Sequence, residues 1–141
     1  RRAGGDTGQV RKIFQTNLPD AVAKYGIIQN AKIYHQDVAI AVSTYSVGRV
    51  TAAQAADELL NIAGIGASFV LYPEEGRVVV SGRSLSDTNV QVILEALGGG
   101  GNAGAAGAQI PDKTVNQVLG ELHAALDNYF DGGDSEEQEQ P

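Results

Sequence analysis

Apolar residues recur at helical spacing in five stretches of the chain, and each stretch predicts an amphipathic helix. The first helix covers residues 7–17 and ends before Pro19, because proline cannot continue a helix from its interior. A second, shorter helix starts at Pro19 or Asp20. A third starts at Thr51, since Gln54 follows at the spacing of a capping box.

The last two predicted helices lie in the second half of the chain. Ser86 or Asp87 caps the fourth helix, and Thr114 starts the fifth, with Gln117 at capping-box spacing. Their buried stripes consist of apolar residues at intervals of three and four. The stripes are Val90, Ile93, Leu94 and Leu97 in the fourth helix, and Val115, Val118, Leu119, Leu122, Leu126 and Phe130 in the fifth.

Between the helices, short runs rich in β-branched and aromatic residues predict strands. Gln36 and Asp37 separate the first two runs, which makes a hairpin the simplest arrangement. Residues 73–76 join the next two runs in a second hairpin. The alternation of strands and helices predicts a single α/β domain, with a mixed β-sheet of four to five strands packed with helices. The predicted strands are residues 31–34, 38–45, 67–72, 77–81 and 106–110.

Four consecutive glycines, Gly98 to Gly101, follow the fourth predicted helix. Glycine suits places where the main chain bends sharply or comes close to a ligand. The run stands between a helix and a strand, so we expect a loop that is part of the fold. Gly99, Gly101 and Gly104 also match the dinucleotide-binding pattern G-x-G-x-x-G. We reject that match, because the fingerprint must follow a strand and open a helix.

Composition and charge indicate a single domain without a membrane span and argue against a DNA-binding protein. The 141 residues, 43% of them hydrophobic, suit one domain with its own core. No apolar run reaches the ~18 residues that span a bilayer, and cysteine is absent. The net charge is −7, but residues 1–126 hold ten basic and eleven acidic groups, so the acidity lies mainly in the C-terminal tail. A basic stripe is not visible, which argues against double-stranded DNA as a partner.

Motifs for unaided catalysis are missing from the sequence. No lysine follows the glycines as in a P-loop, and no nucleophile-elbow pattern occurs. His35 and His123 have no second imidazole or carboxylate at metal-ligand spacing, so we interpret both as solvated or structural. We therefore expect no catalytic residue, metal ligand or cofactor in this chain, and no hydrolysis by the chain alone.

Arg83, Ser84 and the glycine run make a candidate anion site. Arg83 offers a bidentate guanidinium to a phosphate, and Ser84 offers a hydroxyl. The backbone N–H groups of consecutive glycines can form an anion-binding nest. A surface arginine beside a floppy turn has the same spacing, so the residues alone leave both interpretations open.

Seven segments spread along the chain resemble one known family. They are residues 2–7, 53–60, 67–70, 81–85, 89–93, 97–101 and 106–110. Together they resemble the DHHA1 domain of DHH-family phosphoesterases, and within that family the cyclic di-AMP phosphodiesterases. The resemblance implies a helical linker from the end of a DHH domain at residues 1–28, a DHHA1 substrate-binding domain at 29–130, and a disordered acidic tail at 131–141.

The resemblance also implies a division of labour between two domains. A DHH domain, none of whose metal-binding motifs occurs here, would hold two manganese ions, and the DHHA1 domain would bind substrate. The implied partners are cyclic di-AMP and its linear product pApA, the DHH domain of the same parent protein, and a second copy of this chain in a homodimer. The implied location is a cytoplasmic domain of a membrane-anchored parent. The implied substrate-binding residues are Arg83, Ser84, Gly99, Gly100, Gly101 and Asn102.

One position departs from the family pattern. The family motif is G-G-G-H, whose histidine contacts the substrate phosphate, whereas Asn102 follows the glycines here. A neutral hydrogen bond contributes about 0.5–1.5 kcal/mol against about 1.5–3 for a charge-assisted one, so we expect weaker phosphate binding.

Two functions remain open for this chain. It is either the substrate-binding lobe of a cyclic di-AMP phosphodiesterase, or a non-catalytic module that binds nucleotides or single-stranded nucleic acid, or that dimerises.

Overall fold

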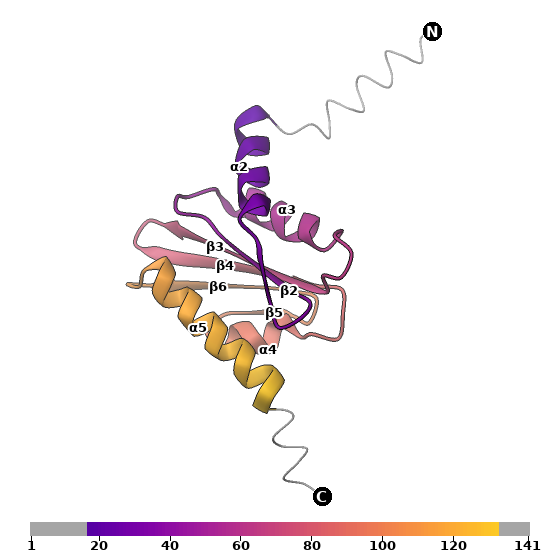
Figure 1. Cartoon of the computed structure of the whole chain (residues 1–141). Helices are drawn as coiled ribbons and strands as arrows, with labels where there is room; N and C mark the ends of the chain where they lie inside the picture. Colours follow the sequence, from indigo (N-terminus) through magenta and orange to yellow (C-terminus); the bar gives the residue numbers. More distant parts are fainter. Residues whose placement is uncertain (1–16, 133–141) are drawn as a thin grey trace, which may run out of the picture.

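In the computed structural model, six strands form one sheet in the order β1-β2-β3-β4-β6-β5 (Figure 1). Only β2 and β3 pair in parallel, and all other neighbours pair antiparallel. The predicted α/β class with a mixed sheet is confirmed, with one strand more than the four to five predicted. The strands are β1 (Lys32–Tyr34), β2 (Val38–Val42), β3 (Ala67–Glu74), β4 (Arg77–Ser84), β5 (Gly100–Asn102) and β6 (Ala105–Pro111).

The structure describes residues 17–132. The helix predicted over residues 7–17 therefore lies outside the described residues except for Asn17. Residues 133–141, which make up most of the predicted acidic tail, also lie outside them. Within the described range, no helix has the length and apolar character needed to cross a membrane.

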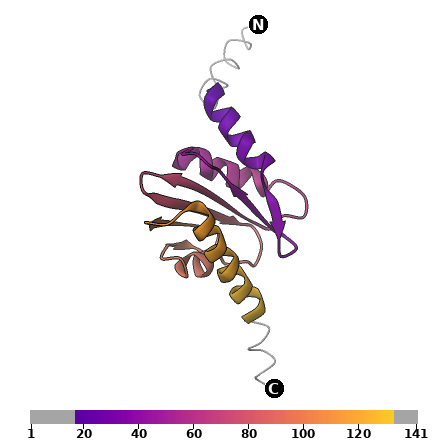
Figure 2. The same cartoon turned by 60° about the vertical axis from the view of Figure 1, so that its left-hand side comes forward.

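Helices lie on both faces of the sheet, and the first described helix projects away from it, as the two views show (Figures 1 and 2). Helices α2 and α3 pack on one face, and α4 and α5 pack on the other. A π-helical turn, Asn128–Gly132, continues α5. The helices are α2 (Leu18–Gln29), α3 (Arg49–Leu59), α4 (Val90–Glu95) and α5 (Val115–Asp127).

The alternation of side chains along β4 separates two cores. Val79 joins the core under α3, whereas Val78 and Val80 join the core formed with α4 and α5. Strand β6 follows the same rule, because alternate residues are buried toward α4 and α5. The residues between them, Gly107 and Gln109, are exposed, since α3 lies over β3 and β4 and leaves β6 uncovered.

Two helix starts follow the sequence closely. Thr114 Oγ1 accepts a hydrogen bond from Gln117 N, and Gln117 Oε1 accepts one from Thr114 N, so the predicted capping box of α5 is confirmed. Helix α2 begins slightly earlier than predicted. Its N-cap is Asn17, whose side chain accepts from Asp20 N, and Pro19 stands in the first turn.

Two other predicted helix starts are wrong. Helix α3 is capped by Gly48, which adopts a φ of 88°, and Thr51 is buried in the first turn instead of capping the helix. Helix α4 is capped by Asn89, whose side chain accepts two backbone N–H groups, and not by Ser86 or Asp87. Near both helix starts, several residues have side chains that could cap the helix. Which of them is the N-cap depends on the path of the chain from the preceding strand or turn.

Candidate functional site

The uncovered side of β6 forms the floor of a hollow of about 620 Å³, with α3 as its wall. We call this hollow the open groove. Its floor includes Ala105, which has only a methyl side chain, and Gly107, which has none, so the sheet backbone is accessible there. The glycine run lies at the border of the groove. Arg83 reaches the same hollow from β4. The fold therefore brings together the arginine and the glycines that the sequence suggested as an anion site.

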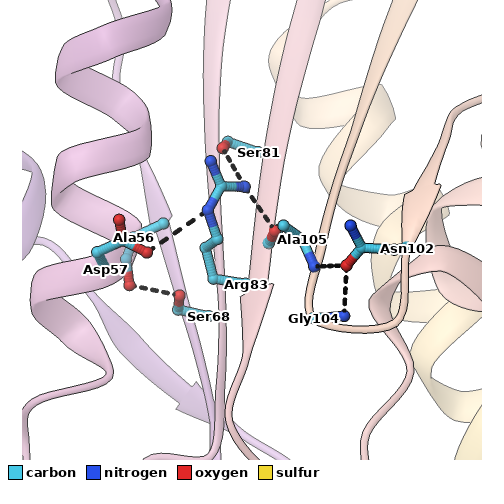
Figure 3. A network of polar contacts seen from close by, with 9 residues as sticks. Ala56, Asp57, Ser68, Ser81, Arg83, Asn102, Gly104 and Ala105 are labelled. Atoms are coloured by element: carbon cyan, nitrogen blue, oxygen red, sulfur yellow. Dashed lines mark hydrogen bonds and ion pairs between the residues drawn. The ribbon is translucent and has the colours of Figure 1, made fainter.

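Arg83 points from β4 toward α3 (Figure 3). Its Nη1 donates to the carbonyl oxygen of Gly82 at 2.8 Å and to Ser81 Oγ at 3.5 Å. Its Nε lies 3.5 Å from Asp57 Oδ1 on α3. These contacts hold the guanidinium at the edge of the groove. An anion that enters meets the attraction of Arg83 and the repulsion of Asp57, whose side chain is 64% exposed and so partly screened by water.

The glycine run is only partly the predicted loop, because its second half belongs to a strand. Gly98, with a φ of 89°, lies in the turn that follows α4, and Gly99 N donates to the carbonyl oxygen of Leu94 at 2.8 Å. Gly100 then starts β5, which pairs antiparallel with β6. No sequence pattern indicates this strand, because glycine has a low strand propensity and the main chain alone makes the pairing.

Steric surroundings divide these glycines into two kinds. A Cβ atom on Gly99 would collide with the carbonyl oxygen of Gly107, and one on Gly101 would collide with that of Ala105. These two positions need glycine because β5 packs closely on β6. A Cβ atom on Gly100 would meet nothing within 4 Å. Packing therefore does not explain Gly100, and its exposed backbone is free for a ligand to approach.

Neither Ser84 nor Asn102 lines the open groove. Ser84 follows Arg83 on β4 and so points to the opposite face, where its Oγ donates to the carbonyl oxygen of Gly66 at 3.3 Å. Asn102 Oδ1 accepts from the backbone nitrogens of Gly104 and Ala105, both at 2.9 Å, and fastens the β5–β6 turn (Figure 3). Both side chains are used to hold the strands that border the groove.

Among the polar residues of the groove that were not predicted from the sequence are Arg49, Tyr72 and Gln109. Tyr72 is fully buried, and its hydroxyl meets no partner at full hydrogen-bond geometry among the described residues, although the Glu74 carboxylate acts on it from close by. Burial raises the pKa of Tyr72, the charge of Glu74 raises it further, and the charge of Arg49 opposes that rise. Gln109 is recognisable as a groove residue only once the register of β6 against β4 is known.

A second polar cluster lies outside the open groove. His35 Nε2 is 2.7 Å from Asp127 Oδ1, and the Tyr34 hydroxyl donates to the same oxygen at 2.9 Å. These two bonds, first that from His35, lower the pKa of Asp127. Asp131 adds a second carboxylate to this cluster. One nitrogen of His35 and one carboxylate oxygen each of Asp127 and Asp131 lie within 4.8 Å of one another. Sequence spacing showed no partner for His35, because 92 residues separate it from Asp127.

His123 is held in the same region by an aromatic contact. Its ring stacks on that of Tyr34, with the two centroids 4.2 Å apart. His35 packs against Phe130, with ring centroids 4.9 Å apart. Both histidines therefore connect the β1–β2 hairpin to α5 and the turn that follows it.

Comparison with known proteins gives one family and several curated relatives. A profile of the DHHA1 domain matches residues 35–131. The chain is 40% identical over 136 residues to the cyclic-di-AMP phosphodiesterase GdpP of Geobacillus thermodenitrificans, a match that covers 94% of this chain and 21% of the relative. It is 36% identical over 135 residues to the cyclic-di-AMP phosphodiesterase PdeA of Listeria monocytogenes, covering 94% of this chain and 20% of the relative. The chain thus spans about a fifth of the length of these relatives.

Among solved structures, the fold is similar to that of an exopolyphosphatase-related protein from Bacteroides fragilis, with a TM-score of 0.75. The match covers 84% of this chain and 37% of that chain, at 19% sequence identity. At this identity the likeness concerns the fold alone, and it agrees with the mixed α/β architecture.

Proposed function

The chain belongs to the DHHA1 domain family, and from this premise we propose that it is the substrate-binding lobe of a cyclic di-AMP phosphodiesterase. Its ligands in this proposal are cyclic di-AMP and the linear product pApA. The observation that carries the proposal is that Arg83 and the glycine run line the same open groove, on the two sides of β6. The two curated relatives, both cyclic-di-AMP phosphodiesterases, give the substrate class.

In the proposed complex, Arg83 and the main chain near Gly100 bind one phosphate. The guanidinium supplies charge-assisted hydrogen bonds, each worth about 1.5–3 kcal/mol. Gly100 has open space in place of a side chain, so a phosphate oxygen can approach the backbone there. Ser84 and Asn102 act as positioning residues, because they fasten β4 and the β5–β6 turn. Gly99 and Gly101 allow β5 to pack on β6.

In this proposal, a DHH domain outside this chain carries out the hydrolysis. Any membrane anchor of the parent protein would also lie outside this chain. In that domain, manganese ions would activate the attacking water. The charged residues at the groove are Arg49, Arg83 and Asp57. One carboxylate beside two guanidinium groups does not suit a divalent cation, which prefers several oxygen or imidazole ligands. The 141-residue chain with added manganese is therefore expected not to hydrolyse cyclic di-AMP, and turnover by the purified chain would contradict this.

Calorimetric titration of the 141-residue chain with cyclic di-AMP and pApA tests the proposal. Arg83→Ala is expected to weaken binding at least ~10-fold, since it removes a charge-assisted contact. Asp57→Asn is expected to strengthen binding, because it removes a negative charge next to the anion. Lys113→Ala removes a positive charge outside the groove and is the matched control. Absent or millimolar binding that Arg83→Ala leaves unchanged would overturn the proposal.

A filter-binding assay with oligoadenylate at low salt separates this function from that of a strand-binding module. A module of that kind combines a basic channel with stacked aromatic side chains, and its affinity falls steeply with salt. We expect the chain to bind cyclic di-AMP more tightly than the oligomer. Tighter, strongly salt-dependent binding of the oligomer would favour the module.

A further inference from the structure

A mixed set of metal-binding side chains lies where the β1–β2 hairpin meets the end of α5, and none of it lines the open groove. The set consists of His35, Asp127 and Asp131, and one ligand atom of each lies within 4.8 Å of the other two. No second group of this kind occurs among residues 17–132. An imidazole nitrogen together with carboxylate oxygens is a donor set that divalent transition metals bind in proteins.

The backbone brings the three side chains together from two elements. Asp127 is the last residue of α5, and Asp131 belongs to the π-helical turn that continues this helix. Residues four apart on a helix lie on the same face, so both carboxylates project from one side of α5 and its extension. His35 follows β1 and contacts that side from the hairpin, with Nε2 2.7 Å from Asp127 Oδ1. The set therefore joins residues that are far apart in the chain.

The charges of this set are not balanced. Two carboxylates face a single imidazole, so the net charge is negative whether His35 is neutral or protonated. The Asp131 side chain makes no hydrogen bond or ion pair with another residue of the range 17–132. Its charge still acts on the cluster, because it adds to the rise in the pKa of Tyr34 that the hydrogen bond to Asp127 causes first. A divalent cation neutralises both carboxylates, whereas the ion pair with His35 neutralises only one.

Neighbouring groups hold the Asp127 carboxylate in place. The Tyr34 hydroxyl donates to Oδ1 at 2.9 Å, and the Tyr34 ring is stacked on that of His123. In the described part of the chain, both hydrogen bonds to this carboxylate involve Oδ1, which leaves Oδ2 for a metal ion. A metal-binding carboxylate that also accepts a hydrogen bond is typical of protein metal sites, because the bond fixes its orientation.

We propose that His35, Asp127 and Asp131 bind a zinc ion that fastens the β1–β2 hairpin to the end of α5. Nitrogen and oxygen ligands lie ~2.0–2.2 Å from zinc, so two ligands of a tetrahedral site are about 3.4 Å apart. The Asp131 oxygen therefore has to move by no more than about 1.4 Å, which rotation of this exposed side chain provides. Water takes the fourth position. This structural site is separate from the proposed phosphate site at Arg83.

The donor set distinguishes zinc from other common divalent ions. Mg²⁺ and Ca²⁺ take oxygen ligands, with six or more around the ion, and gain little from an imidazole. Mn²⁺ binds nitrogen and oxygen donors more weakly than zinc does in the general order of affinities. We therefore expect zinc to bind more tightly than Mn²⁺, and Mg²⁺ to bind most weakly.

Calorimetric titration of the metal-free, untagged 141-residue chain with zinc chloride tests the site. Saturable binding of one ion per chain is expected, because the described residues offer one such set of ligands. Zinc that binds only the folded chain also raises the midpoint of thermal unfolding, and a chelator reverses the rise. Absence of saturable binding, or a midpoint that zinc leaves unchanged, would overturn the proposal.

Asp131→Asn separates a metal site from a plain ion pair between His35 and Asp127. Removing the hydrogen-bonding partner of a metal ligand costs ~10–100-fold in affinity, so loss of a ligand is expected to weaken zinc binding at least ~10-fold. The metal-free variant is expected to keep its unfolding midpoint, since the Asp131 side chain pairs with no other described residue. Asp131→His offers an imidazole instead and is expected to retain zinc binding. Unchanged zinc affinity of Asp131→Asn would contradict the site.

Asp112→Asn is the matched control, because it removes the same charge from an exposed residue before the start of α5. It is expected to leave zinc affinity unchanged. If Asp112→Asn and Asp131→Asn weaken zinc binding equally, the ion is attracted by net charge alone and the site is wrong. Arg83→Ala is also expected to leave zinc affinity unchanged, so failure of the zinc site and failure of the proposed phosphate site are separate results.

Discussion

The two sides of strand β6 differ in what lies over them. On the side of α4 and α5, Ala108 and Ile110 are 5% and 6% exposed and belong to a core. On the side of α3, Gly107 and Gln109 are exposed and line the open groove. The backbone pairing with β4 is the same for both sides. The comparison teaches that one strand can contribute stability on one side and a binding surface on the other, depending only on whether a helix covers it.

Adjacent substitutions on β6 test this comparison most strongly. Ile110→Ala is expected to lower the free energy of unfolding by about 2–5 kcal/mol, since it leaves a cavity in a closed core. Gln109→Ala is expected to change it by no more than about 0.5 kcal/mol, because the side chain is exposed. Urea denaturation followed by circular dichroism measures both. Similar losses from the two variants would mean that the α3 side of β6 is also part of a core.

Two neighbouring glycines give the next largest effect. Gly99→Ala is expected to lose about 1–3 kcal/mol of stability, because the new methyl group collides with the β6 backbone. Gly100→Ala has free space and is expected to keep the stability and lose affinity for pApA. Thermal unfolding and calorimetric titration of both variants measure the contrast. Unchanged pApA binding by Gly100→Ala would remove that position from the proposed phosphate site.

The β5–β6 turn at the edge of the groove gives a smaller effect. Asn102→Ala removes the acceptor for two backbone N–H groups and is expected to reduce stability by about 1 kcal/mol. Asn102→Asp keeps an acceptor oxygen and is expected to restore most of that loss. The unfolding free energies of the two variants check this expectation. Equal stability of the two variants would show that the turn does not depend on this oxygen.

The polar cluster outside the groove gives the smallest expected effect, because its carboxylate is half exposed. The pKa of Asp127 is lowered below 3.8, so its ionised form stabilises the fold above that pH. The contribution is lost as the pH falls through the lowered value. Wild type is therefore expected to unfold at higher urea than Asp127→Asn near neutral pH. The two midpoints are expected to converge once the pH falls below the lowered pKa of Asp127, and a gap that persists there would rule out this linkage.

Much of the fold was predictable from local patterns. The capping box at Thr114 and the apolar stripe of α5 located that helix, and the hairpin of β3 and β4 followed from two β-rich runs. The false start at Thr51 arose because a capping-box match does not reveal that the threonine is buried. Strand β5 was missed because three residues with little strand propensity are held by pairing with β6, which lies later in the chain.

The candidate site was predictable only in part. Arg83 and the glycines were identified from residue type and spacing, and the fold brings both to the open groove. Ser84 was included because it follows Arg83 in sequence, but neighbours on a strand point to opposite faces. Tyr72 and Gln109 were missed because no local pattern connects residues on two strands that do not follow each other in the chain.

By itself, the sequence determined the α/β class, most of the helices and strands, the resemblance to one domain family and the arginine and glycines of a candidate anion site. These features depend on residue type and on spacing within a few positions, so they can be predicted from short segments of the sequence. Three features required the folded chain: β6 is bare on one side, Gly100 alone among Gly99–Gly101 has free space, and Asp127 pairs with His35. The physical reason is that strand order and helix coverage arise from contacts between distant residues, which no short segment encodes.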